Sequence, residues 1–175
     1  MDLNADGETD LVVGATSYSA GGRAYIFYND GQYSTAASSA DVIITSEASG
    51  NNFGRTPATG DLNADGKTDL IVGASGYSST TGRAYIFYND GSYPAGAASA
   101  DVIITGENTG DNFSYGIATG DLNADARTDL VIGGTSYSGT TGRAYVFYND
   151  GSIPTTAATA DAIITGEAAG DGLGI

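Results

Sequence analysis

The sequence predicts an all-β chain made of three β-propeller blades, each a sheet of four antiparallel strands. Three observations lead to this prediction. A block of about 60 residues recurs, headed by Asp2, Asp61 and Asp121. Helical periodicity is absent, and the apolar runs are short and rich in β-branched and aromatic residues. Several runs are apolar on both faces, so both faces of each sheet must be covered, as in stacked blades. We expect one propeller segment over residues 1–175, with repeats at about 2–60, 61–120 and 121–175.

Each block begins with an acidic loop: Asp2 to Asp10, Asp61 to Asp69 and Asp121 to Asp129. Side-chain oxygens stand at loop positions 1, 3, 5 and 9, and glycine stands at position 6 in two of the three loops. This is the ligand pattern that calcium prefers. Carboxylates at this spacing repel one another unless a divalent ion neutralises them. The sequence therefore predicts three calcium sites, with a solvated Asp/Asn turn as the alternative.

The residues after each loop separate it from helix-flanked calcium loops. A helix-flanked loop carries a bidentate glutamate at position 12, whereas that position here is Val13, Val72 or Ile132. Short β-branched runs follow all three loops and end in small residues. We therefore expect each loop to open into a strand.

We assign four strands to the middle block, and the other two blocks follow the same pattern. The third of them is apolar on both faces, and the fourth contains a continuous apolar run. Asn89-Asp90-Gly91 supplies the turn after the third strand, because these residues tolerate a left-handed backbone. The expected strands, from first to fourth, cover residues 112–119, 68–74, 83–88 and 100–105.

These features together resemble the FG-GAP repeats of integrin α-chain β-propellers and of many bacterial surface proteins. The resemblance rests on Phe53-Gly54, on the acidic loop and on Val72-Gly73-Ala74-Ser75 after it, and it covers essentially the whole chain. There are three departures: Ser114 follows Phe113, Leu173 replaces the phenylalanine, and Thr or Ser replaces the proline. The resemblance implies a calcium site between the first and second strands of each blade, on the face opposite the one that contacts ligands.

Mapped onto this chain, the resemblance implies five protein ligands per calcium ion. Four bind through side chains, and the residue at position 7 binds through its backbone carbonyl. The third site is the weakest prediction, because Ala126 replaces glycine and costs about 1 kcal/mol if the position needs a positive φ. The expected ligands are Asp2, Asn4, Asp6, Glu8 and Asp10 in the first loop; Asp61, Asn63, Asp65, Lys67 and Asp69 in the second; and Asp121, Asn123, Asp125, Arg127 and Asp129 in the third.

The composition excludes several classes of function. A net charge of −15 with six Lys and Arg residues argues against nucleic-acid binding. The absence of histidine and cysteine removes Ser-His-Asp and Cys-His catalysis, disulfides and His- or Cys-ligated zinc. No run approaches the ~20 apolar residues that cross a membrane, and no signal sequence follows Met1. We expect a non-enzymatic scaffold of an extracellular or cell-surface protein, of bacterial origin.

Two further sets of residues recur once per block. Glu47, Glu107 and Glu167 match Arg23, Arg83 and Arg143 in number, so we expect structural ion pairs rather than a glycosidase carboxylate pair. Tyr18, Tyr77 and Tyr137 lie between the expected second and third strands. They either stack on a sugar or anchor a protein partner, or they pack between blades. The alternative function is thus a lectin-like propeller, or a fragment of a larger carbohydrate-active or adhesion protein.

The chain ends suggest self-association. If Ile175 aligns with Ile117 and Met1 with Gly120, only the counterparts of Ala118 and Thr119 are missing between two copies. Propellers have 4–8 blades, so two chains would give six blades and three would give nine. We expect a head-to-tail homodimer in which the segment 172–175 of each chain pairs with the first blade of the other. The competing account is a fragment of a larger propeller.

Overall fold

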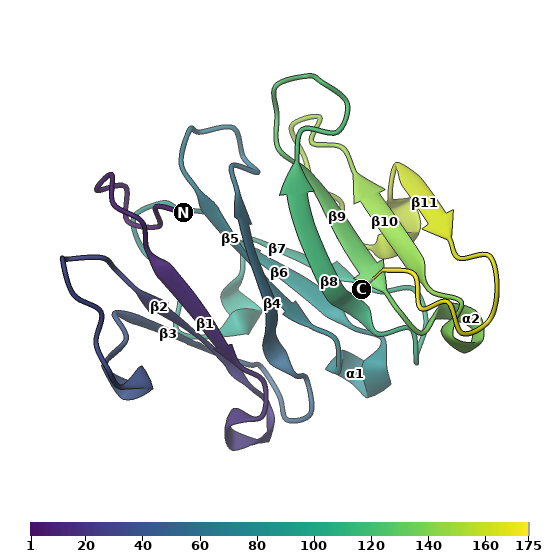
Figure 1. Ribbon diagram of the computed structural model, residues 1–175, viewed down its shortest axis with the longest axis horizontal. Coiled ribbons are helices and arrows are strands. Elements are labelled where there is room, and N and C mark those ends of the chain that lie inside the picture. The colour runs from purple at the N-terminus through teal and green to yellow at the C-terminus, as the bar shows by residue number, and fades with distance from the viewer. Residues whose placement is uncertain (175) are drawn as a thin grey trace.

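The computed structural model describes residues 1–174 as three antiparallel sheets fanned side by side (Figure 1). We call them blades 1, 2 and 3. Blade 1 consists of β1 (Leu11–Ala15), β2 (Arg23–Phe27) and β3 (Val42–Thr45). Blade 2 consists of β4 (Phe53–Gly60), β5 (Asp69–Ala74), β6 (Arg83–Phe87) and β7 (Val102–Thr105). Blade 3 consists of β8 (Phe113–Gly120), β9 (Asp129–Gly134), β10 (Arg143–Phe147) and β11 (Ala162–Thr165).

Short helical turns connect the strands. They are η1 (Tyr18–Ala20), η2 (Ala37–Ser39), α1 (Tyr77–Thr80), η3 (Ala97–Ser99), α2 (Tyr137–Thr140) and η4 (Ala157–Thr159). None of the helices in residues 1–174 has the length and apolar character needed to cross a membrane.

The prediction of four-stranded antiparallel sheets is confirmed for blades 2 and 3, while blade 1 has three strands. One strand assignment was wrong. The segment expected at 112–119 is a strand, but it pairs with β9 and belongs to blade 3. The first strand of blade 2 is β4, which pairs with β5. The reason is local: the acidic loop makes a hairpin, so the strand before a loop pairs with the strand directly after it.

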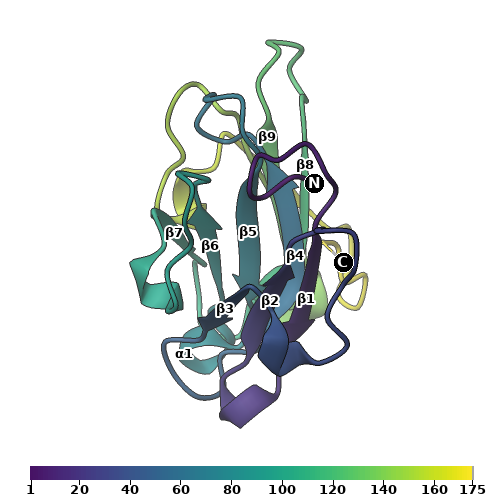
Figure 2. The same cartoon turned by 90° about the vertical axis from the view of Figure 1, so that its left-hand side faces the viewer.

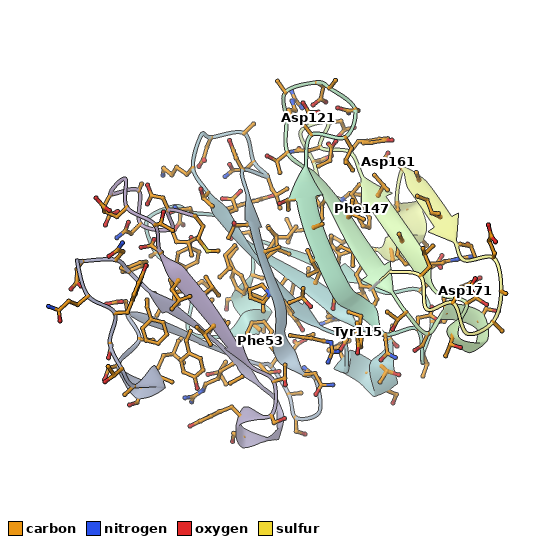
Figure 3. The ribbon with its side chains drawn as sticks, in the orientation of Figure 1. Phe53, Tyr115, Asp121, Phe147, Asp161 and Asp171 are labelled. Carbon is orange, nitrogen blue, oxygen red and sulfur yellow. The ribbon has the colours of Figure 1, made fainter. Side chains whose placement is uncertain are left out.

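The core lies between adjacent blades. Between blades 1 and 2, one buried cluster joins Ile26 and Ile44 to Val72 and Phe87, and an equivalent cluster joins blades 2 and 3. Strands that are apolar on both faces can therefore bury both faces, as the sequence predicted. Phe53 lies between the first two blades (Figure 3) and meets the ring of Tyr85 edge to face, with centroids 5.4 Å apart.

The Phe-Gly pair at the start of β4 explains how closely the blades approach. A Cβ atom on Gly14 would lie 1.7 Å from the carbonyl oxygen of Gly54, so the two backbones touch. Gly54 has a φ of +92°, which glycine adopts without steric cost. Blade 3 has Ser114 at the same place, with a φ of +67°. Its hydroxyl donates to the Arg83 carbonyl at 2.6 Å and accepts from the Ala74 N–H at 3.0 Å.

The last described residues correct the alignment of the chain end. Leu173 forms an isolated bridge to Gly142, as Phe53 does to Gly22. The carbonyl of Gly174 approaches Gly133 as the carbonyl of Gly54 approaches Gly14. Leu173 and Gly174 therefore take the places of Phe113 and Ser114, and the alignment of Ile175 with Ile117 was wrong by two residues. Ile175 itself lies outside the described residues.

Candidate metal centres

The three acidic loops lie at the same end of the fan. The second joins β4 to β5, the third joins β8 to β9, and the first leads directly into β1 (Figure 1). Asp121 marks the third loop in Figure 3. The short helices that carry Tyr77 and Tyr137, α1 and α2, lie at the opposite end (Figure 1), and Figure 2 shows the same for α1. The acidic loops and the tyrosine-bearing turns thus lie at opposite ends of the fan.

In the second loop the side-chain oxygens bond to the loop backbone. Both oxygens of Asp61 accept N–H bonds, from Asp65 at 3.1 Å and from Gly66 at 2.9 Å. Asn63 Oδ1 accepts from the Asp65 N–H at 3.0 Å, and Asp65 Oδ1 accepts from the Lys67 N–H at 2.8 Å. The first and third loops repeat all four bonds. These bonds hold positions 1, 3 and 5 of every loop in one arrangement.

The carboxylate at position 9 is a buried anchor. Asp69 is fully buried and accepts the N–H of Leu62 at 2.8 Å and the N–H of Asn89 at 2.9 Å. Asp10 and Asp129 accept the equivalent pairs of bonds. Burial raises the pKa of Asp69, although its two backbone hydrogen bonds act in the opposite direction. The carboxylate thus ties the start of the loop to the turn after the third strand.

The donor set, which consists of carboxylate, amide and carbonyl oxygens, fits calcium in its chemistry. In residues 1–174 no three acidic side chains converge to form a preformed metal site. Asn63 Nδ2 donates to Asp65 Oδ2 at 3.3 Å. In a calcium site the two side chains would instead share the ion through their oxygens. A carboxylate offers about four lone-pair sites, so Asp61 and Asp65 keep acceptor capacity beyond their backbone bonds. An ion at this loop would bind to that remaining capacity.

Position 6 of each loop needs a positive φ, as expected. Gly7 has a φ of +90° and Gly66 a φ of +83°, while Ala126 adopts +68°. A Cβ atom at Gly7 or Gly66 would meet no heavy atom within 4 Å. The cost of alanine in the third loop is therefore conformational rather than steric.

The side chains at position 7 were missed by the sequence reasoning, which assigned a role only to their carbonyls. Lys67 Nζ donates to the Asn89 carbonyl at 3.1 Å, and the Arg127 guanidinium donates to the Asn149 carbonyl at 3.3 Å. These bonds connect the second and third loops, but not the first, to the Asn-Asp-Gly turn of the same blade. The recurrence of that turn once per block was a signal in the sequence from which this contact could have been found.

At the opposite end of the fan, two of the three recurring arginines and two of the three recurring glutamates form ion pairs, as predicted. Arg83 bonds to Glu47 Oε1 at 2.8 Å, and Arg143 pairs with Glu107. Each pair joins one blade to the next, a detail that the sequence did not reveal. The hydroxyls of Tyr85 and Tyr145 donate to the same two carboxylates, Glu47 and Glu107 respectively.

The tyrosines proposed to bind ligands stack against these arginines. The guanidinium carbons of Arg23, Arg83 and Arg143 lie 3.9, 3.7 and 3.4 Å from the ring centroids of Tyr18, Tyr77 and Tyr137. One face of each ring is therefore covered, and at most the other face is available to a ligand.

Fanned antiparallel sheets with an acidic hairpin loop at one end define a protein of the β-propeller repeat class. The chain belongs to the FG-GAP repeat family, whose sequence profile matches residues 2–27, 53–87 and 113–147.

Similar proteins include integrins and a phospholipase. Bovine phosphatidylinositol-glycan-specific phospholipase D is 34% identical over 149 residues, which is 75% of this chain and 17% of that protein. Chicken integrin alpha-6 is 34% identical over 149 residues, covering 79% of this chain and 13% of the integrin. Human integrin alpha-7 is 31% identical over 140 residues, covering 75% and 11%. The chain therefore spans about a sixth or less of the length of these relatives, and the resemblance to integrin-type repeats is confirmed.

Proposed function

We propose that the chain is a non-enzymatic, calcium-binding propeller module that serves as a structural or protein-interaction scaffold in an extracellular or cell-surface protein. The observation that supports this proposal is the same four-bond arrangement of acidic side chains in all three loops, at one end of the fan. FG-GAP repeats often bind calcium. Each proposed site uses positions 1, 3, 5 and 9 and the carbonyl of position 7.

Calcium would act on stability rather than on chemistry. An ion that binds only the folded state stabilises it by about 2.7 kcal/mol when its concentration is 100 times the dissociation constant. This is a large share of the ~5–15 kcal/mol that keeps a typical domain folded. At the dissociation constants of about 10⁻⁴–10⁻³ M that are typical of extracellular modules, about 1 mM calcium would add roughly 0.4–1.4 kcal/mol per site.

A scaffold role also agrees with the use of the glutamates. Glu47 and Glu107 are held by arginine and tyrosine at blade junctions, so neither is set up as one of a pair of glycosidase carboxylates. The sequence contains no histidine or cysteine to serve as a base or nucleophile. The part of the phospholipase that matches this chain is a small fraction of that protein.

Calcium titration tests the proposal directly. We expect titration calorimetry to show three bound ions and the melting temperature to rise from excess chelator to about 1 mM Ca²⁺. Asp65→Ala removes a ligand from one loop, so two ions should remain. Asp90→Ala, an exposed aspartate in the neighbouring turn, is the matched control and should keep three. A folded chain that takes up no calcium and melts at one temperature in both solutions would contradict the proposal.

A glycan-binding role is the alternative, favoured by the exposed ring of Tyr18 at the end opposite the acidic loops. If it holds, Tyr18→Ala should abolish binding on a glycan array. Tyr33→Ala is the matched control, because Tyr33 is equally exposed but bonds to the Thr9 carbonyl of the first acidic loop. An array without binding would leave the scaffold role alone.

A further inference from the structure

The two junctions inside the chain are built in the same way. At each junction, one blade offers what we call its trailing face to the leading face of the next blade. At the first junction, the trailing face of blade 1 presents Ile26 and Ile44. The leading face of blade 2 presents Leu70 and Val72. At the second junction, the trailing face of blade 2 presents Ile86 and Ile104, and the leading face of blade 3 presents Leu130 and Ile132.

The leading face of blade 1 is open. Leu11 is 40% and Val13 43% exposed, whereas their counterparts in blade 2, Leu70 and Val72, are completely buried. Figure 2 looks at the molecule from this side, with blade 1 nearest the viewer. The face contains a hollow of about 530 Å³, whose lining includes Leu11, Val13, Tyr25 and Phe27. It is the leading face of a three-stranded blade, with no blade against it.

The trailing face of blade 3 is open in the complementary way. Leu122 is 52% and Ile164 55% exposed, whereas their counterparts in blade 2, Leu62 and Ile104, are buried. A second hollow, of about 430 Å³, is lined in part by Val131, Gly133, Ala144 and Gly174. One chain therefore carries both halves of a third junction, at its two opposite sides.

The polar groups of the third junction are also present but separated. Arg83 pairs with Glu47 and Arg143 with Glu107, each across a junction. By the same spacing, Glu167 belongs with Arg23. Within residues 1–174 Glu167 is exposed, and neither Glu167 nor Arg23 forms an ion pair. An unpaired guanidinium on one open face and an unpaired carboxylate on the other are complementary charges.

We propose that the trailing face of blade 3 binds the leading face of blade 1 of a second copy of this chain, and that two copies close head to tail into a six-bladed ring. Glu167 then pairs with Arg23 and accepts the hydroxyl hydrogen bond of Tyr25 of the second copy. Leu173 packs against that Tyr25, as Phe53 packs against Tyr85. A second copy fits because its leading face repeats that of blade 2, with Leu11, Val13, Tyr25 and Phe27 in the places of Leu70, Val72, Tyr85 and Phe87. The trailing face of blade 3 is also apolar, with Val131 and Val146 in the places of Ile71 and Ile86. Six blades lie within the 4–8 of known propellers, and nine do not.

The first test is the mass in solution at saturating calcium, and separately in chelator. Sedimentation should give twice the 17.5 kDa of one chain. Ile164→Asp should weaken association at least tenfold. Ile163→Asp, at the next residue of β11 and on its other face, is 38% exposed and should leave association unchanged. Because both positions are exposed in a single chain, both variants should keep the circular dichroism of the parent.

Charge reversal gives the second test. Glu167→Arg and Arg23→Glu should each be monomeric alone, because both junctions of a dimer would oppose like charges. An equimolar mixture should recover the dimer, because one junction then carries the reversed pair and the other the native pair. A folded parent chain that stays monomeric at high concentration overturns the proposal and assigns the open faces to further blades of another polypeptide. Open-ended polymers, or a mixture that fails to associate, also overturn it.

Discussion

Ser114 stands where blade 2 has Gly54, and it holds a left-handed backbone that glycine adopts freely. Two hydroxyl hydrogen bonds, to Arg83 and from Ala74, offset this strain. Ser114→Gly should lose the bonds but relieve the backbone, for a net cost of about 1 kcal/mol. Ser114→Ala should lose the bonds and keep the strain, at a cost of about 2–3 kcal/mol.

Urea unfolding of the three proteins measures this order. The expected stability is serine first, glycine second and alanine last, at similar m-values. An alanine variant as stable as the parent would mean that the two hydroxyl bonds contribute nothing measurable.

Ala126 carries the equivalent strain without compensation. Its φ of +68° costs about 1 kcal/mol relative to glycine, so Ala126→Gly should raise the free energy of unfolding by about that amount. The third loop should also bind calcium more tightly. Gly66→Ala in the second loop is the mirror experiment and should lower stability by a similar amount. Equal stability of all three proteins in urea would refute the argument.

At the residue scale, the sequence was informative where a side chain acts within its own loop. The spacing of Asp61, Asn63 and Asp65, and the need for positive φ at position 6, are local properties and were anticipated. The two hydrogen bonds that Asp69 accepts from the Leu62 and Asn89 N–H groups were not anticipated, because the second of them joins the loop to a turn 20 residues away. Spacing within a loop contains no information about that turn.

At the scale of the elements, the tyrosine in the middle of the third strand makes the junction sensitive to alkali. Burial raises the pKa of Tyr85, and the hydrogen bond to Glu47 and its negative charge raise it further; Tyr145 is shifted upward in the same way beside Glu107. Unfolded tyrosine ionises near pH 10.0, whereas the folded phenols keep their protons. Their contribution is fully present below about pH 10 and is lost as the pH rises through the higher folded value.

The free energy of unfolding should therefore fall above about pH 10, by up to about 1.4 kcal/mol per pH unit for each of the two tyrosines. Denaturant unfolding between about pH 8 and pH 11 measures the slope, and ultraviolet absorbance of the phenolate should show these two rings titrating only on unfolding. Tyr85→Phe should make the slope shallower. A slope unchanged in that variant would show that Tyr85 ionises in the folded state.

Strands were predicted well at this scale because period, composition and turn residues are all local. Partnership between strands was harder. The strand at 112–119 was placed in the wrong blade, since near-identical repeats leave the sequence equally compatible with pairing to either neighbour. The hairpin made by the acidic loop decides it, and that becomes evident only when β8 is seen beside β9.

At the scale of the whole molecule, the repeats show what each open face would contact. Leu70 and Ile104 are buried against a neighbouring blade, so we expect their exposed counterparts Leu11 and Ile164 to be buried in the same way when a blade packs against them. The sequence suggested self-association from the alignment of the chain ends, and that alignment was wrong by two residues. The faces support the same partner on independent grounds, namely matching apolar surfaces and the separated Glu167 and Arg23.

Association of two such chains must overcome their charge, and this sets its salt dependence. Each chain carries −15, so two copies repel at long range. Raising the ionic strength from about 0.01 M to about 0.15 M shortens the Debye length from about 30 Å to about 8 Å and screens that repulsion. A pair between Glu167 and Arg23 would be screened less, because the side chains of the equivalent pair, Arg83 and Glu47, are only 22% and 20% exposed. The dissociation constant of the dimer should therefore fall as NaCl is added.

Calcium at equal ionic strength should lower this dissociation constant further, since three bound ions would leave a charge of about −9 per chain. Sedimentation over a protein dilution series measures both effects, and a dissociation constant that rises with NaCl would show that the ion pair, rather than net charge, controls association.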